Sequence, residues 1–516
     1  MRCVATILLI ASFALPASAQ TVLEELLLPG ALPAPPGADV DFGYSVDLSD
    51  DLLVVGAPEA ASGEGRLYLY TREGVDWVFD QALGVSLPSA ANASLGRAVA
   101  LDGDRLAATS SGSLVIFELT GGSWQQQAEL ATAPLAHARG LDLGGGFAVI
   151  AEPAADHRVL VFRDNGGWSF EDTLSGGFGD DALGVAVSAD ALFIGREFSA
   201  VLGNESTQQS VLTVYERQLD AWVQVPFDGG GFTQTRLGDA VEIDGDRAVA
   251  SGFSTTTQLF PPAPGVSAYR VSLFTRTGGA WALDEHLPAS PVTRPSAAFA
   301  GDDVVAVGRD AVSEPLAAFA LFRNSGAGWS LEQSALLDPN VEAPFSLGGP
   351  TSAVPDWSVA GQAGHFVAAS RAFDPGTTGD GAAFVWRTSP FGVIEGGQLA
   401  GTAGVTPELR GTGSLAGGSA TTITLTDALP SSTTALLSGT AAAYQPFKGG
   451  VLVPLPNLLV NSLLALPVNA AGERALGFHW PHGVPAGVAL YLQHWVVDAA
   501  APYGYSASNG LELISQ

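Results

Sequence analysis

The 516-residue sequence predicts an all-β fold: a seven-bladed β-propeller closed by its N-terminal strand, followed by a small C-terminal β-sandwich. Three features indicate this class. Tryptophans recur at spacings of 44 to 59 residues through the first three-quarters of the chain, and each opens a short strand. An alternating strand with an aromatic end precedes each tryptophan, and two apolar runs joined by an Asp/Gly turn precede that strand. Four short strands per unit suit a propeller blade. The six tryptophans are Trp77, Trp124, Trp168, Trp222, Trp281 and Trp329.

The first 19 residues have the features of an export signal. Arg2 gives a charged start, residues 4–15 form an apolar run, and "ASA" at 17–19 forms a small-residue cleavage site. We therefore predict a signal peptide at residues 1–19, a mature chain that begins at Gln20, and a secreted or cell-surface location. Cys3, the sole cysteine, leaves with the signal, which excludes a disulfide scaffold. The run is too short for a stable anchor, so no membrane span is expected in the mature chain.

The charge balance is strongly acidic, with 22 Lys+Arg against 52 Asp+Glu and a formal net charge of −30. Such a chain repels nucleic acid and anionic membrane surfaces, so neither is expected as a partner. The simplest interpretation is a soluble monomer outside the cell. Recruitment of cations is the alternative.

The propeller is predicted to occupy residues 20–390. Six complete units precede a seventh, which begins near Trp357 and continues with "GAAFVWR" at 381–387. No tryptophan-led fourth strand follows in that unit. The segment "TVLEELLLP" at 21–29 supplies one, because it parallels "WALDEHLP" at 281–288. A ring closed in this way leaves no exposed sheet edge.

The first unit carries a recognisable pattern: Phe42-Gly43, then Val46, "VVGAP" at 54–58 and "RLYLY" at 66–70. This pattern resembles the FG-GAP repeat of integrin-type propellers, and most closely the repeat of secreted bacterial proteins. Most later units keep the glycine of the opening pair, whereas the third and sixth units lose it. The resemblance extends over about residues 21–387 and implies a β-propeller.

The Asp-Gly pairs raise the question of calcium. Calcium needs six to eight oxygen ligands from one longer loop. The segments "AVALDGDRLAA" and "AVEIDGDRAVA" leave room only for two-residue turns, centred on Asp102-Gly103 and Asp244-Gly245. Asp-Gly there favours a type I′ hairpin turn, with Asp104 and Asp246 facing solvent. We therefore expect hairpins and no cofactor; a weak calcium site is the alternative.

The composition changes near residue 396, where Gly, Thr, Ser and Ala dominate and the tryptophan repeat stops. We predict a Gly/Thr-rich linker at 391–408 and a β-sandwich module at 409–516, because short alternating runs separated by turn residues follow. The closing stretch at 487–513 resembles a module that ends many large secreted bacterial proteins.

Few residues have the pattern of a catalytic or metal site. His479 and His482 form an H-x-x-H with His494 nearby, but Pro481 breaks any helix that could align them, so isolated histidines are expected rather than zinc ligands. The paired acids Asp180-Asp181 and Asp302-Asp303 are interpreted as solvated turn residues. The tryptophans are expected to pack between blades rather than to stack on sugars.

The predicted function is that of a secreted, non-enzymatic binding or adhesion-type protein that presents a propeller loop face to an extracellular protein or glycan. The connections between the second and third strands vary most, at 196–209, 251–267 and 371–380. Variable loops on a rigid scaffold are where recognition usually lies. The partner-binding loop is predicted to carry Leu259, Phe260, Pro261 and Pro262.

The alternative function is an extracellular hydrolase or lyase with a site in the propeller channel. Catalysis there requires His, Arg and carboxylate side chains that converge from the innermost strands. Those strands offer Arg97, Arg139, Asp239 and Glu242.

Overall fold

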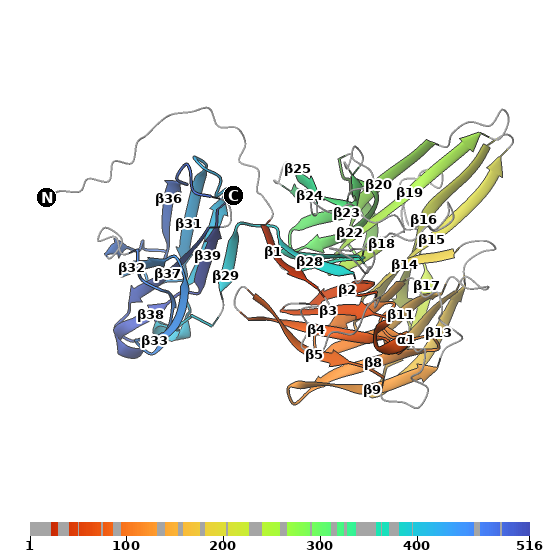
Figure 1. The fold of residues 1–516 in the computed structure, drawn as a ribbon, viewed down its shortest axis with the longest axis horizontal. Coiled ribbons are helices and arrows are strands. Elements are labelled where there is room, and N and C mark those ends of the chain that lie inside the picture. Colours follow the sequence, from red (N-terminus) through yellow and green to blue (C-terminus); the bar gives the residue numbers. More distant parts are fainter. Residues whose placement is uncertain are drawn as a thin grey trace. The chain divides into compact units, whose positions relative to one another are not determined.

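The computed structural model is almost entirely β-structure and forms two compact units, Leu23–Thr388 and a second unit that contains Ser389–Gln516 (Figure 1). No helix among the described residues is long and apolar enough to cross a membrane. The predicted signal at 1–19 lies outside the described residues. The structure describes residues 22–28, 41–49, 51–73, 76–85, 94–131, 140–152, 158–175, 181–202, 205–225, 240–258, 266–288, 292–310, 317–324, 328–336, 358–362, 364–370, 381–394, 396–458, 465–485 and 488–515.

The larger unit consists of antiparallel sheets that follow one another along the chain, named sheets 1 to 7 here. Sheets 1 to 3 contain β2 (Ser45–Ser49), β3 (Leu52–Ala57), β4 (Arg66–Glu73) and β5 (Asp76–Leu83); β6 (Val99–Asp102), β7 (Arg105–Thr109), β8 (Ser113–Thr120) and β9 (Ser123–Ala131); and β10 (Gly140–Gly144), β11 (Phe147–Glu152), β12 (Arg158–Asp164) and β13 (Trp168–Ser175). Sheets 4 and 5 contain β14 (Asp181–Val187), β15 (Ala191–Leu202), β16 (Glu205–Gln218) and β17 (Ala221–Gln224); and β18 (Ala240–Asp244), β19 (Arg247–Gln258), β20 (Val266–Thr277) and β21 (Ala280–His286). Sheets 6 and 7 contain β22 (Val292–Ala300), β23 (Asp303–Asp310), β24 (Ala317–Asn324) and β25 (Trp329–Leu336); and β26 (Ser358–Gln362), β27 (His365–Ser370), β28 (Ala382–Arg387) and β1 (Val22–Leu27).

The first strands of these sheets lie against one another in chain order, β2, β6, β10, β14, β18, β22 and β26, and β26 lies against β2. The core lies between neighbouring sheets, because each sheet buries apolar side chains against both neighbours. Between sheets 7 and 1, for example, Val367 and Val385 share a cluster with Leu53 and Trp77.

The N-terminal strand β1 belongs to sheet 7, where it pairs with β28. Leu27 is 5% exposed and lies in the cluster that joins sheets 7 and 1. The Glu25 carboxylate accepts a hydrogen bond from the backbone N–H of Trp77 in sheet 1, at 2.9 Å. The first strand along the chain is therefore joined to strands more than 300 residues later.

The tryptophans pack between sheets, as predicted. Trp222 of sheet 4 meets Phe147 of sheet 3 edge to face, with ring centroids 5.2 Å apart. Trp281 of sheet 5 meets Phe193 of sheet 4 in the same way at 4.9 Å. Edge-to-face contacts stabilise such pairs beyond the apolar area they bury.

The Asp-Gly segments form two-residue hairpins, but the turn lies one residue later than predicted. Asp102 pairs with Arg105, so Gly103 and Asp104 are the turn residues. Gly103 has φ +58 and Asp104 is not among the residues with positive φ. Glycine at the first position alone fits a type II′ turn rather than the predicted type I′ turn. Asp104 is exposed, as expected.

The C-terminal unit has one sheet in the order β29-β39-β37-β32-β35 with β38 beside β37, a second sheet β30-β31-β36, and a hairpin β33-β34. Both larger sheets contribute to one core that includes Leu409, Ile423, Leu492 and Trp480. The strands are β29 (Phe391–Ile394), β30 (Glu408–Gly413), β31 (Ala420–Thr426), β32 (Thr433–Gly439), β33 (Ala442–Phe447), β34 (Gly450–Pro454), β35 (Leu466–Pro467), β36 (Arg474–His479), β37 (Ala489–Val497), β38 (Tyr505–Ala507) and β39 (Gly510–Ile514).

The segment predicted as a linker, 391–408, begins with a strand of this unit. β29 pairs with β39 from Phe391↔Leu513 to Ile394↔Gly510. Phe391 is 8% exposed and Ile394 is fully buried. The sequence does not predict this strand, because only two buried apolar side chains mark it and a Gly-rich stretch that is typical of a linker follows directly.

Candidate functional site

Three carboxylates stand at the same register position of the innermost strands of sheets 1, 3 and 5. Asp47 of β2 accepts a hydrogen bond from the backbone N–H of Leu101 in sheet 2, at 2.6 Å. Asp142 of β10 accepts one from Val187 in sheet 4 at 2.6 Å. Glu242 of β18 accepts one from Phe299 in sheet 6 at 3.1 Å. Each acid therefore joins its own sheet to the next one.

The matching positions in the other sheets are all alanines. The match follows from the pairing with each second strand, since Asp47 pairs with Val54 as Ala100 pairs with Ala107. Acid and alanine thus alternate through sheets 1 to 6, and sheet 7 has alanine. The alanines are Ala100, Ala186, Ala298 and Ala360.

The electrostatics of these acids differ from those of surface carboxylates. Burial raises the pKa of Asp47 to about 7, although the N–H groups of Leu101 and Leu48 oppose the shift. Burial likewise raises the pKa of Asp142 to about 6 and that of Glu242 well above its ordinary value. Repulsion between the acids raises the pKa values of Asp47 and Glu242 further, because the negative charge of Asp142 acts on both and that of Asp47 acts on Glu242.

Of the channel residues predicted from the sequence, the two that the structure describes, Arg97 and Glu242, have different partners. Glu242 is bound to the backbone of Phe299. Arg97 pairs with Glu59 at 3.4 Å and lies over the ring of Tyr44. Arg139 and Asp239 lie outside the described residues. Sequence reasoning missed Asp47 and Asp142, although both occupy the position of Glu242 in the repeat.

The histidines of the C-terminal unit lie in different surroundings. His479 and His482 are exposed, whereas His494 is buried and its Nδ1 lies 2.9 Å from Thr434 Oγ1. Burial lowers the pKa of His494 to about 3, so its ring is neutral. Within the described ranges, no group of three or more His, Cys, Asp or Glu could hold a metal ion.

The prediction that Asp302 and Asp303 are both solvated holds for Asp302 but not for Asp303. Asp302 is exposed, but Asp303 is 6% exposed and accepts two hydrogen bonds from the Arg323 guanidinium, at 2.8 and 2.5 Å. Asp303 begins β23 and stands opposite Arg323 on β24, which supplies the paired cation that a buried acid needs. Asp180 lies outside the described residues.

A long four-stranded arm distinguishes sheets 4 and 5. The segments predicted as variable loops at 196–209 and 251–267 are mostly strand, because the hairpins β15–β16 and β19–β20 continue far beyond their sheets. β16 pairs with β19 from Glu205↔Gln258 to Gln209↔Ser254, and this joins sheets 4 and 5 into one eight-stranded sheet. Figure 1 shows β15, β16, β19 and β20 extending together away from the other sheets.

The arm is predicted poorly from sequence because its strands are polar. The paired segments read "ESTQQ" and "STTTQ", which lack the apolar alternation of a half-buried strand. Pairing satisfies their backbone groups instead, and Thr is well suited to strands. The predicted contact residues Leu259, Phe260, Pro261 and Pro262 connect β19 to β20 and lie outside the described residues.

Comparison with protein families identifies one repeat within the first unit of the chain. The FG-GAP repeat family matches residues 34–70, which include the first unit's Phe42-Gly43 and "VVGAP". No curated protein matches the chain. Among solved structures, the WD40 domain of Neurospora crassa Pan2 is 10% identical, with a TM-score of 0.41 over 72% of this chain and 96% of that one. The WD40 domain of SCAP from fission yeast is 9% identical, with a TM-score of 0.37 over 96% of this chain and 98% of that one.

Proposed function

We propose that this protein is a secreted, non-enzymatic binding protein whose four-stranded arm and tip recognise an extracellular protein or glycan. The observation that carries the proposal is the pairing of β16 with β19. An isolated two-stranded hairpin is only marginally stable in water, and this pairing makes the two hairpins parts of one sheet. Connections that a rigid scaffold holds in place are the usual site of recognition.

In this proposal, the larger unit is a seven-bladed β-propeller that is closed by β1 and carries the arm. Two observations support it: the contacts of the first strands return from β26 to β2, and β1 supplies the fourth strand of sheet 7. The FG-GAP match over residues 34–70 supports the propeller, and the signal-like pattern of residues 1–19 supports secretion. The proposal includes cleavage after Ala19 and release or surface display of a chain that begins at Gln20.

The arm has features of a surface for strand addition. β14 pairs with β15 only as far as Glu197, so no described strand covers the outer edge of β15 from Phe198 to Leu202. That edge has the sequence "FSAVL", without charge or proline, the residues that usually protect an edge. An extended partner segment can add to such an edge through main-chain hydrogen bonds.

The test is capture of extracellular partners by the full-length protein and by a variant whose two hairpins are shortened together. Residues 198–209 and 254–268 are each replaced by a two-residue Asn-Gly turn. The matched control inserts a Gly-Ser pair at the short connection that contains Gly112, on the same side of sheet 2. We expect the shortened variant to keep its melting temperature within a few degrees and to lose partner capture, while the control keeps both. Unchanged capture by the folded, shortened variant would refute the assignment to the arm.

A further inference from the structure

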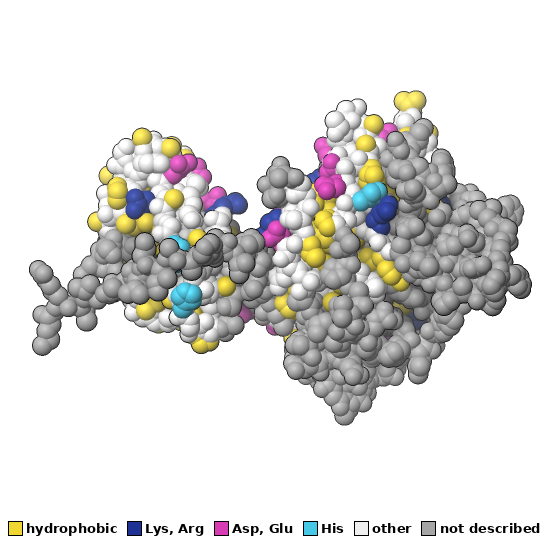
Figure 2. Space-filling model, turned by 90° about the horizontal axis from the view of Figure 1, so that it is seen from above, with side chains coloured by type: hydrophobic (Ala, Val, Ile, Leu, Met, Phe, Trp, Pro, Cys, Tyr) yellow, Lys and Arg dark blue, Asp and Glu magenta, His cyan; other side chains and the backbone are white. Residues whose placement is uncertain are grey.

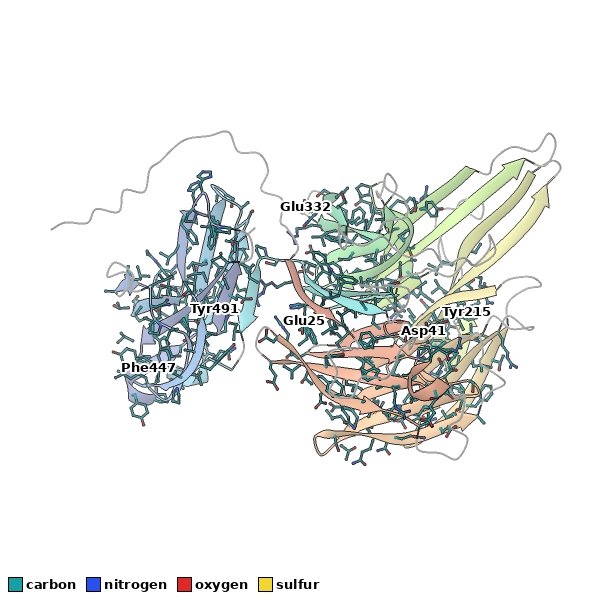
Figure 3. The ribbon with its side chains drawn as sticks, viewed as in Figure 1. Glu25, Asp41, Tyr215, Glu332, Phe447 and Tyr491 are labelled. Atoms are coloured by element: carbon teal, nitrogen blue, oxygen red, sulfur yellow. The ribbon has the colours of Figure 1, made fainter. Side chains whose placement is uncertain are left out.

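Exposed aromatic side chains gather at one hairpin of the C-terminal unit. Phe447 at the end of β33 is 39% exposed, and Tyr503 in the turn before β38 is 76% exposed. Figure 3 labels Phe447 at the end of the unit where Figure 1 labels β33 and β38. Figure 2 shows other hydrophobic side chains of this unit scattered among polar ones. Scattered exposed apolar residues are normal, but a cluster indicates a contact surface.

The aromatic rings surround a single two-residue turn. Phe447 meets the buried Trp495 edge to face at 4.8 Å. The Lys448 ammonium lies 5.3 Å from the centre of the Tyr505 ring. A Cβ on Gly449 would lie 3.0 Å from Cδ2 of Tyr503, so the Tyr503 ring rests on the turn backbone. We call Phe447, Lys448, Tyr503 and Tyr505 the aromatic patch.

The backbone that holds Tyr503 is strained. Tyr503 has φ +52 and is the third residue of a turn in which Gly504 N–H donates to the Ala501 carbonyl at 3.0 Å. Gly or Asn usually occupies that position, since a bulky residue with positive φ is disfavoured. A tyrosine there presents its ring to solvent at a cost in stability. Such strain is concentrated at ligand-binding sites.

We propose that the aromatic patch is a carbohydrate-binding site that takes a pyranose ring of a neutral polysaccharide. The C–H face of a sugar ring stacks on an aromatic face, which carries partial negative charge. The phenol groups of Tyr503 and Tyr505 and the Lys448 ammonium donate hydrogen bonds to ring hydroxyls. Packing of Phe447 on Trp495 and of Tyr503 on Gly449 fixes the rings in advance, which lowers the entropy lost on binding.

Size and charge select this class of ligand. A stable protein interface uses about 20–30 residues on each side, whereas the aromatic patch consists of four residues, which suits a ligand as small as a sugar ring. An anionic polymer is disfavoured because the chain has a formal net charge of −30 and Lys448 is its sole lysine. The site lies on the C-terminal unit, so it is independent of the function proposed for the arm.

The test measures binding of the full-length protein to soluble xylan, galactomannan and β-glucan by affinity electrophoresis, and to cellulose and chitin by depletion from solution. Alginate serves as the anionic comparison. We expect binding to at least one neutral polymer that persists in about 0.5 M NaCl, because stacking is not screened by salt. Tyr503→Ala and Phe447→Ala should each weaken that binding about tenfold, the scale of one lost aromatic contact. Phe170→Ala, which removes a 56% exposed aromatic from the larger unit, should leave it unchanged.

Tyr503→Gly separates binding from folding. Glycine adopts the turn's positive φ without strain, so this variant should melt at or above the temperature of the parent and still lose polysaccharide binding. The proposal is overturned if none of the neutral polymers binds, if binding survives Tyr503→Gly, or if only alginate binds and salt abolishes it. The variant with the shortened arm should bind polysaccharide normally, which keeps failure of this proposal distinct from failure of the one for the arm.

Discussion

At the residue scale, three acids occupy positions where neighbouring sheets have alanine. Asp47, Asp142 and Glu242 each use a carboxylate to satisfy a backbone N–H on the free edge of the next innermost strand. The same burial that makes these bonds strong makes the charged form costly. Their protonation is therefore linked to the stability of the fold.

The direction of this linkage follows from the pKa shifts. The folded-state pKa of Asp47 is about 7, against an ordinary value of 3.8. Between these two pH values, the Asp47 carboxyl therefore holds a proton in the folded protein but not in the unfolded chain. The stability that Asp47 contributes is fully present below about pH 4 and is lost as pH rises to about 7. A shift of this size corresponds to roughly 4 kcal/mol at most for one acid. We predict that the melting temperature falls between pH 4 and pH 8.

Neutral variants check this prediction. Asp47→Asn with Asp142→Asn and Glu242→Gln should flatten the dependence of melting temperature on pH. The acidic chain as a whole also gains stability when its charges are reduced, so the control removes three exposed acids, with Asp104→Asn, Asp246→Asn and Asp302→Asn. If both triple variants flatten the profile equally, the cause is general charge repulsion and not the three buried acids Asp47, Asp142 and Glu242.

At the element scale, the strand pattern of the repeat was predictable and the arm was not. Tryptophan-led fourth strands and short Asp/Gly hairpins have local signals, because packing between sheets and positive φ each restrict the residues that fit. The arm depends on β16 meeting β19 some 50 residues later, and its Ser, Thr and Gln residues carry no such signal. The patch likewise combines "PFKG" with "PYGY", which only the fold brings together.

Proline in the paired region tests the arm as an element. Thr256 of β19 pairs with Thr207 of β16, and proline removes a ladder hydrogen bond and blocks the close approach of strands. We predict that Thr256→Pro lowers hydrogen-exchange protection in residues 205–209 by at least tenfold while protection of the innermost strands is kept. Loss of protection throughout the larger unit would mean that the arm stabilises the whole of that unit.

At the scale of the whole molecule, the ends of the larger unit are joined by its first strand. Deletion of residues 21–29 removes β1, the buried Leu27 and the Glu25–Trp77 hydrogen bond. Each fully buried leucine stabilises by about 1.5–3 kcal/mol, a sizeable part of the net stability of a domain. We predict a melting temperature lower by at least ten degrees for the larger unit; an unchanged value contradicts closure through β1.

Calcium provides a second test at this scale. The two-residue hairpins at Gly103-Asp104 and Gly245-Asp246 present too few oxygens for a calcium cage. A ligand that binds only the folded state raises stability by mass action. We predict that melting curves with chelator and with millimolar calcium agree within about one degree. A large rise with calcium would locate ligands elsewhere in the chain.

Lys448 has a practical consequence for how the protein can be attached to a surface. As the sole lysine, on an exposed hairpin turn, it is the one side-chain amine available to amine-reactive esters. Once the N-terminal α-amine is blocked, immobilisation through the Lys448 amine attaches every molecule by the same turn, which then lies against the support. Sensor chips prepared in this way hide the Tyr503 and Phe447 rings, whereas coupling through carboxylates leaves these rings accessible on part of the molecules, in random orientations.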